Sequence, residues 1–145
     1  MRYLYHIITF ASDGGRHYQS VYPAKRDDAY WCGQLAVDEF DTHYFDREHF
    51  RGERMRKRAV EHIREGLPTY IIPRKGFITL RPGRIDLIAV AKKYHRKGIG
   101  RKLVKHALYH SGQLYVGTPL DNFSAQAFYR SLGFIPCGLE AVYGP

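Results

Sequence analysis

One stretch of the chain, residues 85–105, constrains the fold more than any other. Its apolar residues 87–90 read as a buried strand, and a basic segment then opens a helical pattern at Gly98-Ile99-Gly100. Residues 92–105 contain seven of the 23 Lys and Arg side chains and no acidic residue. Glycines at a helix start let a ligand approach the backbone, whose free N–H groups and helix dipole favour an anion. The pattern predicts a phosphate site at this turn.

The glycine turn departs from two well-known phosphate-binding sequences. A P-loop needs Ser or Thr after Gly-Lys, whereas Arg101 and Lys102 follow Gly100 here, so nucleotide hydrolysis is not expected. A dinucleotide-binding fingerprint needs a third glycine, and Leu103 occupies that position. A basic helix start that simply faces solvent is the alternative interpretation, because charge runs commonly face water.

Length and charge limit the classes of protein to which this chain can belong. With 145 residues, of which 44% are hydrophobic, it suits one packed domain, and we treat 1–145 as that domain. Two cysteines exclude a disulfide framework or a Cys-rich zinc module. The net charge of +9 favours an anionic partner. No stretch approaches the roughly 20 apolar residues of a membrane span, and residues 1–12 lack a signal-peptide cleavage pattern. We therefore expect a cytoplasmic protein with no membrane partner.

Strand-like and helix-like segments alternate along the chain, which favours an α+β fold of packed layers. Expected strands cover residues 1–11, 17–22, 69–72, 77–81, 85–91, 114–116 and 134–143, and expected helices cover 27–40, 52–65, 98–111 and 121–132. The three strands between 69 and 91 are joined by short turns and predict an antiparallel meander.

A second motif follows at residues 122–134 and reads Asn122-Phe-Ser-Ala125-Gln-Ala-Phe-Tyr129-Arg-Ser-Leu-Gly133-Phe134. Together with the strand and glycine turn before it, this motif resembles the GCN5-related N-acetyltransferases, the GNAT superfamily. The resemblance is firm over residues 77–136 and looser over 20–76. It implies an α+β (α/β layered) fold with a mixed, mostly antiparallel central sheet, about four flanking helices and splayed central strands. Residues 1–12 are then an extra N-terminal strand.

Shorter matches resemble one branch of the superfamily. Residues 42–50, 76–80, 84–90 and 114–122 are similar to the sugar-nucleotide branch typified by dTDP-fucosamine acetyltransferase. His95 departs from the superfamily, which usually has Gln or Arg three residues before the first glycine. Arg96 and Lys97 are then the side chains that can supply the missing donor.

The resemblance implies an acyltransferase that moves the acetyl group of acetyl-CoA to a primary amine. Tyr129 would donate a proton to the leaving thiolate, and a backbone N–H near Val90 would stabilise the oxyanion. The residues implied to bind the coenzyme are Ile88, Ala89, Val90, His95, Arg96, Lys97, Gly98, Ile99, Gly100, Arg101 and Asn122.

Each catalytic assignment has a plainer alternative. Tyr129 lies on an apolar helix face and can be a packing residue, and Asn122 can be only the N-cap of that helix. Asp86 is the first candidate for the base that deprotonates the amine, although a strand aspartate can merely pair with an arginine. The loop residues His43, Glu48 and His49 are further candidates for the base, and a water chain would replace them all.

Two other residue pairs are considered for chemistry. His106 and His110 are four apart on a helix, which suits a metal, but no carboxylate or cysteine accompanies them, so we expect surface histidines and no metal. Cys32 and Cys137 have apolar or aromatic neighbours, which is typical of buried thiols without a catalytic role.

Several acceptors and one different class stay open. A nucleotide-linked amino sugar suits the branch resemblance, a protein or peptide amine suits a short chain with an open cleft, and a polyamine suits a protein of charge +9 poorly. The different class is a non-catalytic module that binds CoA or nucleic acid. Nucleic acid is not the expected partner, because no platform of aromatic residues interleaves the basic turn. Whether the chain forms a homodimer is also open.

Overall fold

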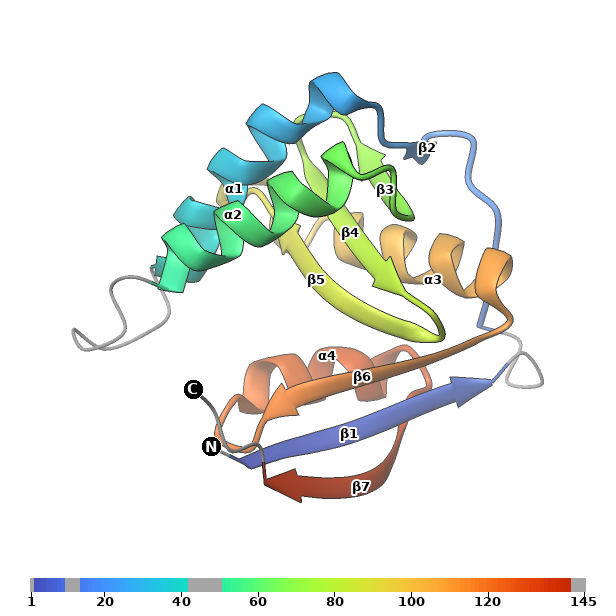
Figure 1. Cartoon of the computed structure of the whole chain (residues 1–145). Coiled ribbons are helices and arrows are strands. Elements are labelled where there is room, and N and C mark those ends of the chain that lie inside the picture. Colours follow the sequence, from blue (N-terminus) through green and yellow to red (C-terminus); the bar gives the residue numbers. More distant parts are fainter. Residues whose placement is uncertain (1, 10–13, 42–50, 142–145) are drawn as a thin grey trace.

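The computed structural model describes residues 2–9, 14–41 and 51–141. Within these residues a seven-stranded sheet has the order β2–β3–β4–β5–β6–β1–β7 and is accompanied by four α-helices (Figure 1). The strands are β1 (Arg2–Thr9), β2 (Tyr22–Pro23), β3 (Thr69–Ile72), β4 (Gly76–Arg81), β5 (Arg84–Val90), β6 (Gln113–Pro119) and β7 (Ile135–Ala141). The helices are α1 (Ala29–Asp41), α2 (Arg51–Arg64), α3 (Ile99–Ser111) and α4 (Phe123–Ser131), with short 3-10 turns at Arg26–Asp28 and Lys92–Tyr94. The expected α+β class is confirmed.

Strands β5 and β6 are parallel neighbours, whereas the other strand pairs of the described sheet are antiparallel. Their register joins Arg84 to Tyr115, near the beginning of both strands. Beyond that point the two strands diverge, as Figure 1 shows. The splayed central strands that the sequence predicts are therefore present, and among the described residues no strand pairs with the β6-facing edge at the end of β5.

The strands β3, β4 and β5 are covered on both faces, which explains their nearly continuous apolar sequence. Phe77 and Leu87 pack against α1 and α2, while Ile78 and Ile85 join the core that α3 supplies. Consecutive residues of β4 thus enter two separate cores. In β5 a register shift between Ile85 and Leu87 places these two residues in different cores. These packed layers hold the end of β5 in place.

The N-terminal strand β1 lies inside the sheet, between β6 and β7, and pairs antiparallel with both. His6 and Ile8 point from it into the core beneath α3 and α4. The expected extra strand is thus an interior member of the sheet. Strand β1, the first of the described strands, thus pairs with β7, the last.

The strand expected at residues 17–22 is wrong for most of its length, because only Tyr22 and Pro23 pair with β3. The preceding segment runs as irregular backbone along α3 instead. A Cβ placed on Gly15 would lie 2.9 Å from the backbone nitrogen of Tyr109, so the two backbones touch. Within the described residues, no helix has the length and apolarity that crossing a membrane requires.

Candidate active site

A cavity of about 850 Å³ opens where β5 separates from β6. It lies between the end of β5, the start of α3 and helix α4. Ten of the residues that the sequence assigns to coenzyme binding line it: Ile88, Ala89, Val90, His95, Arg96, Gly98, Ile99, Gly100, Arg101 and Asn122. Two other residues that the sequence assigns to the site, Lys97 and Asp86, do not line this cavity. The fold therefore brings both sequence motifs to one cavity.

The opening of α3 forms one wall with backbone donors. Gly98 is the N-cap, its φ of 81° is left-handed, and no side chain caps the helix there. The first N–H groups of α3 consequently lack the partners that they would have inside a helix. Arg96, with φ of 63°, is also left-handed, which is uncommon for a residue with a side chain. The turn directs amides and cations toward the cavity, an arrangement that suits a diphosphate.

Gly100 keeps the gap between α3 and α4 open. A Cβ at this position would lie 3.2 Å from the ring of Phe128 and 3.6 Å from a methyl group of Val90. All three residues line the cavity. A larger side chain at position 100 would therefore narrow the space where β5, α3 and α4 meet.

Tyr129 lies on α4 and lines the cavity while only 4% of its surface is exposed. Its ring is 5.1 Å from that of Phe128 and 5.3 Å from that of Phe134, measured between centroids. Burial raises the pKa of the Tyr129 hydroxyl, because an apolar environment disfavours the phenolate. The hydroxyl therefore keeps its proton at neutral pH, as a proton donor must.

Asn122 has the capping role that the sequence leaves open, and its role in coenzyme binding stays a prediction. Its Oδ1 accepts a hydrogen bond of 3.1 Å from the Ala125 amide, so the residue caps α4. The same side chain lines the cavity. The cap occupies the side-chain oxygen, and the residue lies on the α4 side of the cavity.

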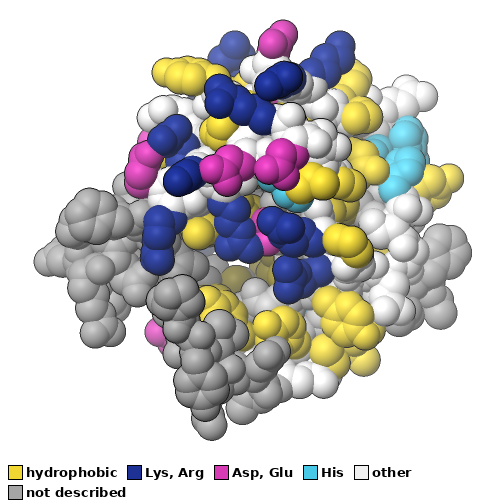
Figure 2. Space-filling model, viewed as in Figure 1, with side chains coloured by type: hydrophobic (Ala, Val, Ile, Leu, Met, Phe, Trp, Pro, Cys, Tyr) yellow, Lys and Arg dark blue, Asp and Glu magenta, His cyan; other side chains and the backbone are white. Residues whose placement is uncertain are grey.

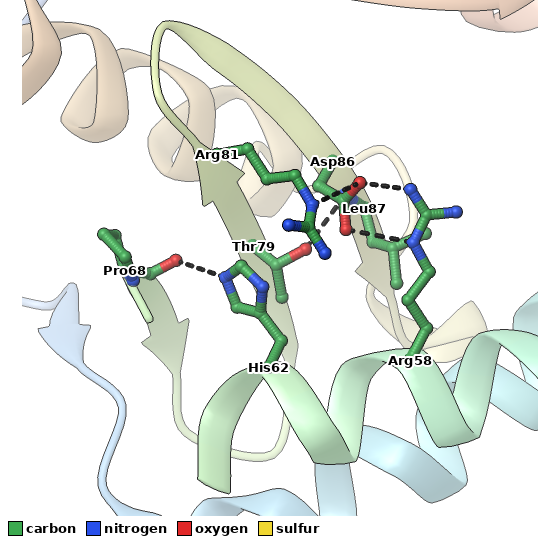
Figure 3. A network of polar contacts seen from close by, with 7 residues as sticks. All are labelled: Arg58, His62, Pro68, Thr79, Arg81, Asp86 and Leu87. Carbon is green, nitrogen blue, oxygen red and sulfur yellow. Dashed lines mark hydrogen bonds and ion pairs between the residues drawn. The ribbon is translucent and has the colours of Figure 1, made fainter. Parts of the chain in front are cut away.

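Asp86 sits in an ion-pair network (Figure 3) and does not line the cavity. Arg58 of α2 contacts both carboxylate oxygens, and Nε of Arg81 lies 3.6 Å from Oδ1. The Asp86 side chain is only 1% exposed, whereas those of the two arginines are 43% and 44% exposed. A carboxylate held by two guanidinium groups favours the structural alternative, which joins α2 to β4 and β5. Its role as a base stays a prediction.

Glu39 is a cavity-lining carboxylate that the sequence reasoning missed. It comes from α1, and its Oε1 lies 2.8 Å from Nε2 of His95. The same His95 nitrogen lies 2.8 Å from the carbonyl oxygen of Val90, so its N–H is shared between the two acceptors. The Glu39 side chain is 12% exposed. Because 56 residues separate Glu39 from His95, no local pattern could have linked them.

The other residues that the sequence singles out are the loop candidates for the base, the two histidines of α3 and the two cysteines. His43, Glu48 and His49 lie outside the described residues. The expectation of two surface histidines is wrong for His106, which is 2% exposed, while His110 is exposed. Cys32 is buried as expected, but Cys137, on the edge strand β7, is exposed.

A smaller cavity of about 380 Å³ lies at the turn between β4 and β5. Its lining residues are Tyr5, Arg81, Pro82, Gly83, Arg84 and Tyr115. Two cations and two aromatic rings thus meet where β5 and β6 are still paired. From Arg84 to Ile88, where the larger cavity begins, a strand extends about 13 Å. The two cavities consequently lie along one strand.

Comparison with known families accounts for this geometry. Residues 60–136, more than half of the chain, match the model of the acetyltransferase (GNAT) domain. The chain belongs to the GNAT family. The matched range contains β5, α3 and α4, which together build the large cavity.

Individual GNAT relatives agree with this assignment in fold. An acetyltransferase of Clostridium difficile 630, described as a possible one, superposes with a TM-score of 0.64 at 16% identity, covering 86% of this chain and 95% of the other. AAC(6')-Iy, solved with the bisubstrate analogue CoA-S-monomethyl-acetylneamine, has a TM-score of 0.58 at 15% identity with the same coverage. At these identities the likeness shows the fold.

A GNAT relative with closer sequence similarity matches a shorter region. N-alpha-acetyltransferase 30 of Xenopus laevis is 42% identical over 60 residues, which is 38% of this chain. The chain spans about a fifth of that relative's length, since the match covers 22% of it. The branch of sugar-nucleotide enzymes that the sequence resembles is not among these relatives.

Proposed function

We propose that this protein is an N-acetyltransferase that moves the acetyl group of acetyl-CoA to a primary amine. The observation that carries the proposal is the single cavity that unites the uncapped start of α3, the free end of β5 and the hydroxyl-bearing ring of Tyr129. AAC(6')-Iy, of the same fold, holds a CoA-containing analogue. Each of the three parts has a separate task in the transfer.

The donor would bind along the wall formed by β5 and α3. Its diphosphate would rest on the amides between Arg96 and Arg101, where the helix dipole and basic side chains favour negative charge. Its pantetheine arm would lie beside residues 88–90, and Asn122 would contact it from α4. Gly100 leaves the width that the arm needs.

In the proposed reaction the amine nitrogen attacks the thioester carbonyl carbon. The carbon–sulfur bond breaks, and the leaving sulfur takes the proton of the Tyr129 hydroxyl to give the thiol of CoA. The proton that the nitrogen sheds as the amide forms restores that hydroxyl. A backbone N–H near Val90 would hold the oxyanion meanwhile.

The amine enters as an ammonium ion and must first lose one proton. We assign that proton to Glu39, because its carboxylate lines the cavity and contacts His95, which lines the cavity as well. Asp86 is the alternative from the sequence, but its two arginine partners hold its oxygens outside the cavity. Glu39→Gln should lower kcat about 100-fold. Asp38→Asn, on the exposed side of the same helix turn, is the matched control and should leave kcat unchanged.

A peptide α-amine is the acceptor that the Xenopus laevis relative supports, since that relative is an N-alpha-acetyltransferase. A nucleotide-linked amino sugar is the second candidate, and the smaller cavity supports it. Arg81 and Arg84 there can pair with a diphosphate, and Tyr5 or Tyr115 can stack on a base.

Thiol release from acetyl-CoA, measured with a panel of amines, tests the proposal. The panel contains short peptides with free N-termini, nucleotide-linked amino sugars and an amino sugar without the nucleotide. Release above the hydrolysis rate with one class identifies the acceptor. Release with none, together with thermal stabilisation by nucleic acid and none by CoA, would replace the enzyme by a nucleic-acid-binding module.

If sugar nucleotides are preferred, Arg84→Ala should raise KM for the nucleotide-linked sugar about tenfold and leave KM for the plain amino sugar unchanged. Arg74→Ala, which removes an exposed cation from the β3–β4 turn at the opposite end of β4, is the control. An equal rise for both sugars would remove the smaller cavity from the acceptor site.

A further inference from the structure

We propose that His17, His106 and His110 form a binding site for a transition-metal ion of the zinc class. One ring nitrogen from each histidine can be chosen so that all three lie within 4.8 Å of one another. Histidine side chains gather at one edge of the molecule in Figure 2. Imidazole nitrogens are preferred ligands of zinc, nickel and copper.

The spacing of the rings suits one shared ion. Nδ1 of His17 lies 3.0 Å from Nε2 of His110, and the centroids of the three rings are 4.6–5.2 Å apart. Zinc bonds of about 2.0–2.1 Å hold two tetrahedral ligands roughly 3.4 Å apart. Small rotations about the side-chain torsions therefore bring all three nitrogens to one ion. A water molecule can occupy the fourth position.

The fold fixes the three side chains before any ion arrives. His106 and His110 are one turn apart on α3, so both face the same side of the helix. The Arg16 amide donates to the Lys105 carbonyl at 3.0 Å and sets His17 over that side. Tyr70 of β3 packs its ring 4.8 Å from that of His106 and 5.6 Å from that of His110. The cluster is thus walled by α3, by β3 and by the segment before β2.

The hydrogen bonding of His106 offers a way to detect an ion. The side chain is buried, and its ring lies beside those of His17 and His110. The Tyr18 amide donates to its Nδ1 at 3.0 Å, which leaves the ring proton on Nε2.

Metal binding would remove that hydrogen bond whichever nitrogen is used. An ion at Nδ1 takes the lone pair that now accepts from Tyr18. An ion at Nε2 displaces the proton there, and the neutral ring then carries its proton on Nδ1, where it faces the Tyr18 N–H. The Tyr18 amide consequently reports directly on whether His106 is a ligand.

The site would fasten the segment before β2 to α3, far from the large cavity. From Gly98 to His110 the helix rises about 18 Å, because each residue adds 1.5 Å. We therefore expect an ion to raise the unfolding temperature, because it binds only the folded arrangement. The inference is independent of the proposed acetyl transfer.

The test uses the whole chain without a polyhistidine tag, with ZnCl2 titrated in a non-chelating buffer and binding measured by calorimetry. One ion per chain is expected. His17→Ala and His110→Ala remove exposed rings and should each weaken binding at least about 100-fold, since even outer-shell partners cost about 10–100-fold. Tyr109→Phe keeps all three imidazoles and a ring that contacts His17 and His110, so it should bind zinc as the unmodified chain does. Absent binding, or equal binding by all variants, would overturn the site.

A second measurement separates three ligands from two and does not depend on replacing the buried ring. The Tyr18 amide, followed by NMR, should shift and lose its protection against hydrogen exchange when zinc saturates the site. An unchanged Tyr18 amide at zinc saturation would show that His106 is not a ligand, and it would overturn the three-histidine site.

Discussion

The two walls of the large cavity are built in different ways. The donor wall comes from segments that are close in sequence, namely the end of β5, the turn before α3 and the start of α4. Its important groups are backbone amides and small residues. The second wall brings Glu39 and Phe40 from α1, far back in the chain. Its groups are side chains that meet only after the layers have packed.

This difference explains why the residues of the first wall can be predicted from the sequence and those of the second cannot. A backbone amide at a helix start can be predicted from glycines and a helical pattern, because the chemistry does not depend on distant partners. A carboxylate becomes a base or a structural ion-pair partner according to what packs against it. Asp86 and Glu39 differ in that respect, since arginines hold the first and a cavity-facing histidine contacts the second.

The largest expected effect is on kcat and concerns Tyr129, whose hydroxyl serves the reaction that both walls would support. Tyr129→Phe removes the proposed proton donor and keeps the ring that packs between Phe128 and Phe134, so kcat should fall about 100-fold. The dissociation constant of acetyl-CoA, measured by calorimetry, should stay nearly constant. Tyr30→Phe alters an exposed hydroxyl on α1 and is the control. Small and equal changes in kcat and binding would make Tyr129 a packing residue.

The donor wall alone is tested by Gly100→Val. Its side chain would press on Phe128 and Val90 and narrow the space for the pantetheine arm, so we expect the dissociation constant of acetyl-CoA to rise about tenfold. Gly138→Ala, where an added Cβ meets nothing within 4 Å, should bind normally. Normal coenzyme binding by a folded Gly100→Val chain would show that the arm takes another route.

The contrast between the two carboxylates is tested by Asp86→Asn. The change weakens the contacts with Arg58 and Arg81, and it should lower the free energy of unfolding by about 1–3 kcal/mol. Urea denaturation measures this loss, and kcat below the unfolding temperature should stay within about twofold of its original value. Asp27→Asn, at an exposed site, is the control. A fall of about 100-fold in kcat with unchanged stability would instead make Asp86 the base.

The smallest effect is a change in the free energy of unfolding with pH, and it concerns His106, which lines neither wall. The pKa of His106 is lowered to about 4 by burial and by His110 and His17, whereas an unfolded histidine has a pKa of about 6.5. Between these values the unfolded chain binds a proton that the folded chain does not. The free energy of unfolding should therefore keep its highest value above pH 6.5, as far as His106 is concerned. It should fall by about 1–2 kcal/mol between pH 7 and pH 5.

Urea denaturation at the two pH values, in a buffer with a chelator, measures this fall. His106→Gln should reduce it, while the buried His6, whose pKa is also lowered by burial, keeps a part of it. An identical fall in the His106→Gln chain would assign the pH dependence to other groups.

Several elements could be predicted from sequence because their signals are local. The ends of α2 and α4 are marked by Gly66 and Gly133, and both adopt the positive φ that ends a helix. The glycine turn and the cap at Asn122 were equally readable. The strand expected at 17–22 failed because contacts with α3, which begins about 80 residues later, decide its path.

Sequence alone determined the layers, the approximate helix boundaries and the glycine turn before α3, since each depends on the preferences of neighbouring residues. The tertiary structure decided the rest. It inserted β1 between β6 and β7, it separated the roles open to Asp86 and Glu39, and it placed His17 beside His106 and His110. The physical reason is the same in each case. The ionisation, burial and partners of a side chain depend on residues that only packing brings near.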